Sequence, residues 1–239
     1  CGIVYLFQYG DNSVAVKIPD DTTYVDYEVD IINNHLKHIC EENIIPLRII
    51  EDQVGNSFVV MQEANGDLSD IKLDERLIFK IILRVAEMLI CFLERDIIYF
   101  DLKLENILYK CHGNNITIYL ADIGSFTIKG DLIQGGTFVP PEALDKKYYK
   151  ANRNIVTYAF GCFIGQLYGY NYLGYKNEKL TTYETVTKYY YPNFIEKVLA
   201  DSRIPNSIKV LIESFTKIDP KERKQYEIET VFDLINVGN

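Results

Sequence analysis

The chain has 239 residues, of which 48% are hydrophobic and 25% are charged, and this composition is typical of a globular protein. Its formal net charge of −9 argues against a general nucleic-acid-binding protein, because no basic face can dominate. No run of about 18 uncharged apolar residues occurs, so no membrane span is expected. The length suits one large domain or two small lobes around a cleft.

The five cysteines are scattered, without a C-x-x-C pair. Such a set favours reduced thiols in an intracellular protein over a disulfide framework or a zinc site. No signal peptide is recognisable, so a cytoplasmic location is expected. Because Cys1 is not a natural initiator, we expect the sequence to begin inside a longer gene product. The many Ile, Asn, Lys and Tyr residues fit an AT-rich genome such as that of a large DNA virus or a parasite. A viral protein of this kind would be located in the host cell.

The first part of the chain predicts a small, largely antiparallel sheet with one helix. Apolar residues recur at a helical period over residues 26–40. Turn-forming residues separate the apolar runs around this helix. Four strands are expected, at residues 1–8, 13–18, 44–51 and 57–62.

The second part of the chain predicts a mainly helical region. A polar link at residues 62–67 is interpreted as a hinge, which divides the chain into a first lobe at 1–64 and a second lobe at 65–239. An apolar run over 116–121 predicts a strand. Helical periodicity predicts helices at residues 74–93, 156–168, 193–199, 205–215 and 227–236.

The most informative stretch is a short loop between two apolar runs at residues 99–109, which carries Asp101, Lys103 and Asn106. A carboxylate can orient a hydroxyl and accept its proton, an ammonium can neutralise charge on a moving phosphoryl group, and an amide oxygen can ligate Mg²⁺. Asp122 follows a later apolar run and would supply a second metal ligand on a turn. The set suits phosphoryl transfer.

Asp101-x-Lys103-x-x-Asn106 followed by Asp122-x-Gly124 resembles the catalytic loop and metal-binding motif of eukaryotic-type protein kinases. Each motif alone is weak, because Asp, Asn and Gly are common in loops; their joint order is what carries the resemblance. It implies an α+β, two-lobed kinase-like fold. It also implies Asp101 as the catalytic base, Lys103 as a catalytic residue, and Asn106 and Asp122 as ligands of Mg²⁺, or alternatively of Mn²⁺.

The resemblance extends to an ATP site in the first lobe. Gly2 and Val4 match the last two fixed positions of the glycine-rich loop G-x-G-x-x-G-x-V, whose earlier glycines are absent from this numbering. The run Val14-Ala15-Val16-Lys17 matches the V-A-I-K strand, whose lysine holds the α- and β-phosphates and pairs with a helix glutamate. Glu28 is preferred for that glutamate over Asp26 and Asp30. The implied nucleotide-binding residues are Gly2, Val4, Ala15, Lys17, Glu28, Met61, Glu63, Ala64, Asp67 and Leu108.

Within that set, Met61 would stand at the back of the adenine pocket. Backbone groups near Glu63 and Ala64 would bond the adenine edge, and Asp67 would reach the ribose.

The run Phe138-Val139-Pro140-Pro141-Glu142 resembles the A-P-E end of a kinase activation segment. Glu142 is expected to form a structural ion pair with Arg223 of Asp219-Pro220-x-x-Arg223.

Several positions depart from the family pattern. Tyr99 and Phe100 replace the usual His-Arg before the catalytic Asp, and Ile123 replaces Phe in D-F-G. Val156 stands where an Asp usually anchors the catalytic loop. The sequence therefore predicts a loop held by packing instead of polar bonds, and an activation segment without an arginine to grip a phosphate.

Lys103 favours a serine/threonine kinase, and the resemblance implies a protein substrate. Activity is expected to depend on the Lys17–Glu28 pairing and on a regulatory partner that holds the helix in place. One alternative is a pseudokinase that acts as a scaffold or decoy, motivated by Phe100, Val156 and the incomplete glycine-rich loop. A second alternative is a small-molecule kinase of related fold. No pattern indicates an oligomeric state.

Overall fold

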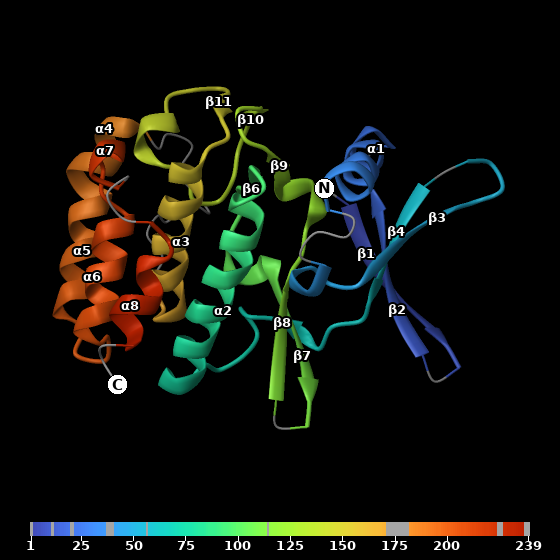
Figure 1. Cartoon of the computed structure of the whole chain (residues 1–239), viewed down its shortest axis with the longest axis horizontal. Helices are drawn as coiled ribbons and strands as arrows, with labels where there is room; N and C mark the ends of the chain where they lie inside the picture. The colour runs from blue at the N-terminus through green and yellow to red at the C-terminus, as the bar shows by residue number, and fades with distance from the viewer. Residues whose placement is uncertain are drawn as a thin grey trace. The chain divides into compact units, whose positions relative to one another are not determined.

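The computed structural model describes residues 2–10, 12–19, 22–36, 41–55, 57–113, 115–170, 182–223 and 227–236 (Figure 1). Contacts divide the chain into a first unit, Cys1–Ile71 with Glu105–Phe126, and a second unit, Lys72–Leu104 with Thr127–Asn239. The first unit is built on antiparallel sheets with one long helix, and the second is mainly helical, so the expected α+β class is confirmed. The division differs from the expected lobes, because residues 105–126 group with the N-terminal residues.

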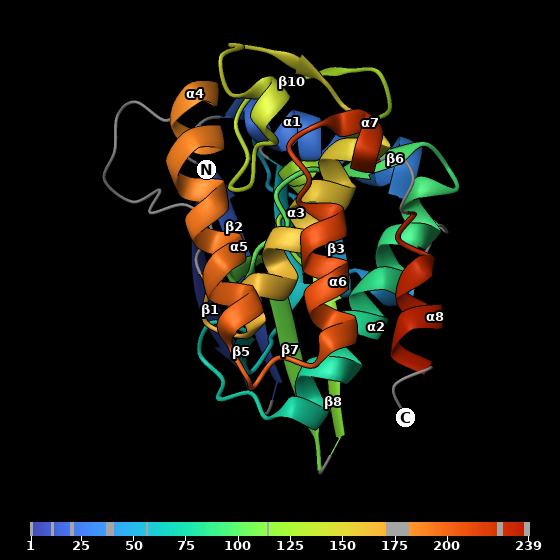
Figure 2. The same ribbon diagram turned by 90° about the vertical axis from the view of Figure 1, so that its left-hand side faces the viewer.

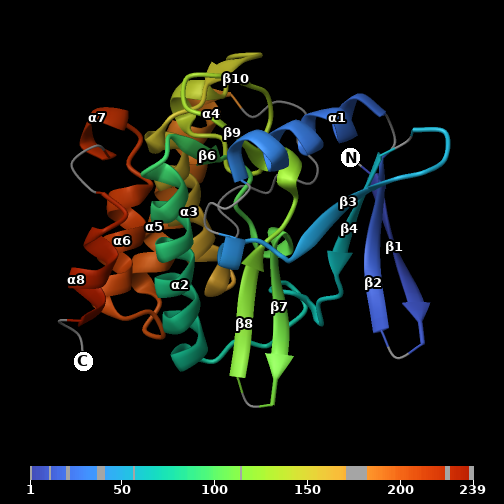
Figure 3. The ribbon, with the colours of Figure 1, turned by 45° about the vertical axis from the view of Figure 1, so that its right-hand side comes forward.

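The main sheet of the first unit has the strand order β1-β2-β4-β3, antiparallel throughout (Figure 3). Its four strands are β1 (Gly2–Tyr9), β2 (Asn12–Pro19), β3 (Leu47–Glu51) and β4 (Ser57–Gln62). Successive side chains of a strand point to opposite faces, so partners across the ladder share a face. Val4 pairs with Lys17 and Lys17 pairs with Val59, which places these three side chains on one face.

The helix of the first unit is α1 (Thr22–Ile31), which continues as a π-helical turn at Ile32–Leu36. It begins earlier than the expected range 26–40, because Thr22 and Thr23 at its start give no apolar periodicity. Residues 37–40 of that range lie outside the described residues. The helix presents Glu28, which is 4% exposed.

A second sheet of this unit has the order β5-β7-β8, formed by β5 (Gly66–Asp67), β7 (Ile107–His112) and β8 (Asn115–Leu120). The expected hinge at 62–67 thus ends in a short strand, which pairs with β7. The hairpin of β7 and β8 brings the residues after Asn106 beside those before Asp122, and the amide of Ala121 donates to the carbonyl of Asn106 at 2.9 Å.

The second unit is organised around α3 (Arg153–Leu167), nearly all of whose side chains are buried. The glycine at position 161 allows α6 (Asn206–Phe215) to approach it closely, since a Cβ there would lie 2.7 Å from the Cβ of Phe215. The long helix α2 (Glu75–Leu93) buries one apolar face and begins at Asp74, whose carboxylate accepts the amide of Leu77 at 2.7 Å. Figure 2 shows α5 and α6 running beside α3.

The remaining elements are short. The helices are α4 (Tyr183–Thr185), a π-helical turn (Val186–Tyr190), α5 (Tyr191–Ala200), α7 (Pro220–Arg223) and α8 (Thr230–Asn236). The strands are β6 (Ile97–Tyr99), β9 (Phe126–Ile128), β10 (Leu132–Ile133) and β11 (Tyr149–Lys150). Single 3-10 turns occupy Glu41–Asn43, Leu104–Asn106, Ile123–Ser125 and Pro141–Ala143.

The cysteines differ from the expectation of reduced thiols. Cys111 and Cys162 carry free thiols, but Cys91 is disulfide-bonded, so the expectation is wrong for that residue. Cys1 and Cys40 lie outside the described residues. Within the described ranges, no helix combines the length and apolarity needed to cross a membrane.

Candidate active site

The first unit contains an open cavity of about 450 Å³. Its walls come from β1, β2, α1, β4, the link to β5, and the turns that flank β7 and β8. Most of the residues that the kinase resemblance assigned to ATP or metal line this cavity. These are Val4, Ala15, Lys17, Glu28, Met61, Ala64, Asp67, Leu108 and Asp122.

Lys17 is the electrostatic centre of the cavity. Its Nζ donates to Glu28 Oε1 in a short contact and lies 3.1 Å from Asp122 Oδ1. Burial by itself lowers the pKa of Lys17, but the hydrogen bonds and charges of Glu28 and Asp122 outweigh it and raise the pKa above its ordinary value. The lysine is therefore a stable cation next to two carboxylates.

Asp122 takes an unusual backbone conformation, with φ of 54° and ψ of 75°. The left-handed region is uncommon for residues other than glycine, and Asp is among those that tolerate it best. In this conformation Oδ2 accepts the hydroxyl of Ser125 at 2.8 Å, while Oδ1 faces Lys17. The side chain stays 40% exposed along the cavity, so its oxygens are accessible to a cation.

Asn106, the other predicted metal ligand, is 8% exposed and is not among the described residues that line the cavity. Its neighbour Glu105 lines the cavity in its place. Within the described part of the chain, no group of three His, Cys, Asp or Glu side chains could hold a metal ion. The donors present nevertheless fit Mg²⁺, which binds one or two protein oxygens together with phosphates.

The link between β4 and β5 supplies the other end of the cavity. Met61 and Ala64 line it, whereas Glu63 turns its carboxylate to the hydroxyl of Ser13. Neither Glu63 nor Ala64 makes a backbone–backbone bond to another described residue, although Gln62 and Asn65 on either side do. The backbone groups of these two residues are therefore available to a ligand.

Sequence reasoning missed several residues that line the cavity. Side chains two residues apart in a strand share a face. This alternation would have found Leu6, two residues after Val4, and Val59, two residues before Met61. No local pattern marks the others, because the chain brings them together from separate turns. The complete set of missed residues is Leu6, Val59, Gln62, Gly66, Glu105, Ala121 and Ile123.

The second unit holds the other predicted catalytic residues. Lys103 Nζ lies 2.7 Å from Asp101 Oδ2, and the amide of Thr137 donates to Asp101 Oδ1 at 2.6 Å. Burial raises the pKa of Asp101, but the hydrogen bonds and charge of Lys103 and the bonds of Thr137 prevail and lower the pKa below its ordinary value. Asp101 is therefore an oriented carboxylate. Thr137 was not predicted in this role, since it reaches Asp101 from far along the chain.

The loop around Asp101 is held partly as expected. Leu102 is fully buried and Val156 is fully buried in α3, which agrees with support by packing. A polar bond also contributes, because the amide of Leu104 donates to Oε1 of Gln166 at 3.4 Å. The expectation of packing alone was therefore incomplete.

The expected ion pair between Glu142 and Arg223 is present. Arg223 Nη2 donates to Glu142 Oε2, and the guanidinium lies 5.0 Å from the centre of the Tyr158 ring. The arginine is fully buried, so the pair ties the end of the activation segment to the helical core. Its position at the base of the segment marks it as structural.

Comparison with known proteins agrees with this geometry. A family model described as a protein kinase domain matches residues 5–231. No curated protein matches the chain. The matched region includes Lys17 and the Asp101–Lys103 pair, and a protein kinase domain implies a phosphotransferase that uses ATP, a divalent metal and a protein substrate. The chain therefore belongs to the eukaryotic-type protein kinase family.

Proposed function

We propose that the chain is a serine/threonine protein kinase that transfers the γ-phosphoryl group of ATP to a protein hydroxyl. The observation that carries the proposal is the arrangement of Asp101, whose two oxygens are held by Lys103 and by the amide of Thr137. A carboxylate fixed in this way can orient a substrate hydroxyl and accept its proton as oxygen attacks phosphorus and ADP leaves. Lys103 would neutralise charge on the transferred group.

The nucleotide would occupy the cavity of the first unit. Lys17, held by Glu28, would bind the α- and β-phosphates. The free backbone groups of Glu63 and Ala64 would bond the adenine edge, and Asp67 would bond the ribose. Val4, Ala15, Met61 and Leu108 would supply apolar contacts to the base.

A bound Mg²⁺ or Mn²⁺ ion would neutralise charge on the phosphates. Asp122 would hold it with an exposed carboxylate, and Asn106 would assist from the 3-10 turn that precedes β7. This assignment rests on the oxygen character of both side chains. Gly2 would place its backbone over the phosphates at the start of β1.

Preference for serine and threonine is inferred from Lys103, which pairs directly with the proposed base. The lobes that serve the reaction are proposed to divide at residue 64, so that residues 1–64 cover the nucleotide and residues 65–239 carry catalysis and substrate binding. Activity would depend on the Lys17–Glu28 pair, which a regulatory partner could strengthen by holding α1.

A pseudokinase remains the second candidate, favoured by Phe100 and by the apolar environment of Val156. The test is a radiolabelled ATP transfer assay with generic protein substrates and the full-length protein, in Mg²⁺ and in Mn²⁺. Label on serine and threonine, identified by phosphoamino-acid analysis, supports the proposal. Label on tyrosine overturns the specificity, and nucleotide binding without any transfer overturns catalysis and supports the pseudokinase.

A further inference from the structure

The second unit contains a pocket of about 360 Å³ that the proposed reaction does not use. It lies where the end of the activation segment meets the residues that lead into α3. Part of its wall is apolar, formed by Leu132, Pro140, Ala143, Tyr148, Tyr149 and Ile155. Lys146 and Lys150 supply the cationic part, together with Glu142 and Asn152.

The charges in this pocket are unbalanced. Glu142 is committed to Arg223, and the nearby Asp145 accepts the amide of Tyr183 at 3.2 Å. Neither Lys146 nor Lys150 has an ion-pair partner among the residues that the structure describes. In a chain with a net charge of −9, two unpaired ammonium groups on one pocket form a local site for an anion.

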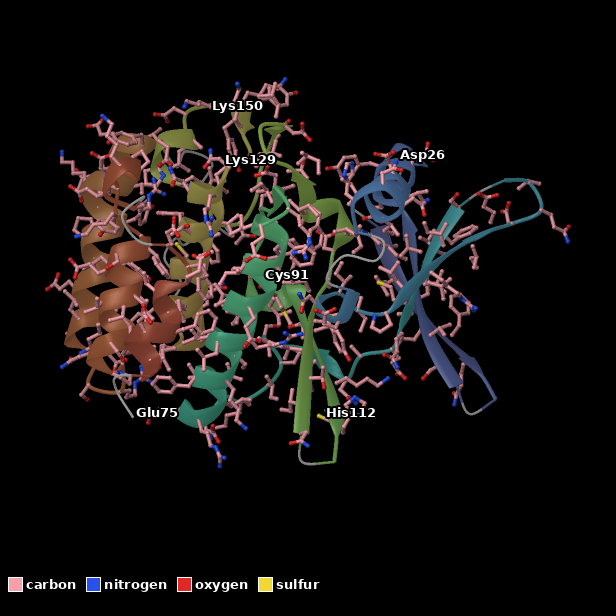
Figure 4. All side chains as sticks on the ribbon, in the orientation of Figure 1. Asp26, Glu75, Cys91, His112, Lys129 and Lys150 are labelled. Carbon is pink, nitrogen blue, oxygen red and sulfur yellow. The ribbon has the colours of Figure 1, made fainter. Side chains whose placement is uncertain are left out.

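The backbone beneath both lysines is fixed. Lys150 pairs with Leu132 across the β10–β11 ladder, and the side chain of Asn152 donates to the carbonyl of Lys150 at 2.9 Å. The amide of Lys146 donates to the carbonyl of Ala143 at 3.1 Å. Figure 4 shows Lys150 at the surface beside these strands. A ligand therefore meets lysines on an organised wall, which lowers the entropy lost on binding.

Tyr149 connects the pocket to the proposed base. Its ring contributes to the pocket, and its hydroxyl donates to the carbonyl of Gly135, two residues before Thr137. Burial, followed by the negative charge of Asp101, raises the pKa of Tyr149 to about 12, so the hydroxyl stays protonated. Because Tyr149 bonds to Gly135 and the amide of Thr137 bonds to Asp101, the pocket adjoins the reaction centre of this unit.

We propose that this pocket binds an anionic side chain of the protein substrate, a carboxylate or a phosphate, close in sequence to the hydroxyl that is phosphorylated. The inference rests on the proposed function for the identity of the substrate, and it narrows that substrate to acidic or previously phosphorylated segments. Lys146 and Lys150 bind the anion, and the apolar wall receives the stem of its side chain. Glu142 stays in its ion pair with Arg223 and does not compete with the anion for the lysines.

The test uses three peptides that share one serine acceptor and differ only in flanking residues: glutamates, phosphoserine or glutamines. Transfer kinetics are measured for the wild-type protein, for the double variant Lys146→Ala/Lys150→Ala, and for Lys147→Ala. The last is a matched control, because its ammonium lies over the Tyr148 ring at 5.2 Å and does not line the pocket. Binding of the same labelled peptides without ATP is followed by fluorescence anisotropy.

The wild type should use an anionic peptide about tenfold better than the glutamine peptide, as expected for two partly exposed ion pairs. The double variant should lose this preference mainly through KM, Lys147→Ala should keep it, and raised salt should weaken it. A gain for both anionic peptides identifies a general charge site, and a gain for phosphoserine alone identifies a phosphate site.

Transfer to all three peptides at equal rates overturns the proposed anion binding in this pocket and leaves the kinase proposal intact. A preference that survives in the double variant, or one that Lys147→Ala removes equally, also overturns it. If no peptide is phosphorylated but anisotropy shows the lysine-dependent preference, the pocket stands and the catalytic proposal fails.

Discussion

Two ion pairs, one in each unit, show how similar contacts serve different ends. In the first unit Lys17 contacts two carboxylates, Glu28 and Asp122, along an open cavity. In the second unit Arg223 is fully buried and contacts one carboxylate, Glu142, while its Nε and Nη1 have no hydrogen-bond partner among the described residues. The first group carries one negative charge in excess, whereas the charges of the second group balance, although its arginine has unused donors.

This difference separates a site that can act from one that holds the fold. A cavity whose lysine already has two carboxylate partners can accept another cation and the phosphates that accompany it. A buried arginine that lies against an aromatic ring and is already paired with Glu142 is closed to ligands, and its removal leaves a half-buried carboxylate without its partner. Changes at the open group, Lys17 with Glu28 and Asp122, should therefore affect ligand binding. Changes at the closed pair, Arg223 with Glu142, should affect the stability of the fold.

The largest effect is expected from Arg223→Ala. It should lower the free energy of unfolding by about 3–5 kcal/mol, because the variant leaves Glu142 without its partner and removes a large buried side chain. Chemical denaturation monitored by circular dichroism measures the change. Lys221→Ala, on the exposed side of the same short helix, serves as the control. A loss below about 1 kcal/mol in Arg223→Ala would show that the closed pair is not structural.

Asp101→Asn tests whether a functional ion pair is distinguished by its exposure to solvent and not by the unit to which it belongs. Asp101 and Lys103 belong to the second unit, yet their side chains are 13% and 26% exposed. The variant should reduce turnover by a factor on the order of 10² or more, because the amide cannot accept a proton. The melting temperature should change little, since the shape of the side chain is kept. Near-normal turnover would remove Asp101 from the mechanism.

Asp122→Ala should remove the metal-dependent part of ATP binding, because the exposed carboxylate is the proposed ligand of the ion. The unfolding temperature should fall modestly, because Ala tolerates the left-handed backbone less well than Asp and Ser125 loses its acceptor, whereas Lys17 keeps Glu28 as a partner. Calorimetric titration with ATP, with and without Mg²⁺, measures the binding. Equal Mg-ATP affinity in the two proteins would point to another metal ligand or to the pseudokinase.

Lys103→Met should change the pH dependence of turnover. Lys103 helps to lower the pKa of Asp101 in the folded protein, so the variant should raise that pKa and move the acid limb of the profile to higher pH. Because the pKa of Asp101 is lower in the folded than in the unfolded protein, the ionised carboxylate stabilises the fold above the unfolded pKa. This stabilisation is lost as the pH falls through the folded pKa. The pH–rate profiles of both proteins measure this shift. An acid limb that stays at the same pH in the variant would contradict this role of Lys103.

The smallest effect is expected from dephosphorylation, which should leave activity unchanged. Phe100 cannot donate to a phosphate, and Ser125 and Thr127 are each 3% exposed and bonded to Asp122 and Asp131. Active protein is treated with a broad phosphatase, checked by mass spectrometry and assayed again. Collapse of activity, restored by phosphorylation of Ser125, Thr127 or Thr137, would contradict this account of Phe100.

Local patterns in the sequence predicted much of the fold. The long amphipathic helix α2 and strand β4 were expected almost at their observed bounds, because periodicity over several turns or alternation over several residues is a strong signal. The start of α1 was missed, since Thr22 and Thr23 give no apolar periodicity. The grouping of residues 105–126 with the N-terminal residues is a property of contacts, which no local window contains.

The same limit applies to the site. Motif spacing gathered Lys17, Glu28 and Asp122 correctly around one cavity, although the residues come from three separate elements. Thr137 beside Asp101 and Gln166 beside Leu104 carried no such signature, because a backbone amide or a single glutamine can bond anywhere. The disulfide at Cys91 was missed for a related reason, since connectivity does not follow from scattered cysteines.

The burial of α3 on all sides has a consequence for hydrogen–deuterium exchange. Amides in most helices exchange through local fraying, but those in the middle of α3 are covered by side chains that are themselves buried, such as Val156, Phe160 and Ile164. Such amides exchange only when the surrounding structure opens as a whole. Deuterium uptake in a single peptide from this helix should therefore report the opening free energy of the second unit without any denaturant.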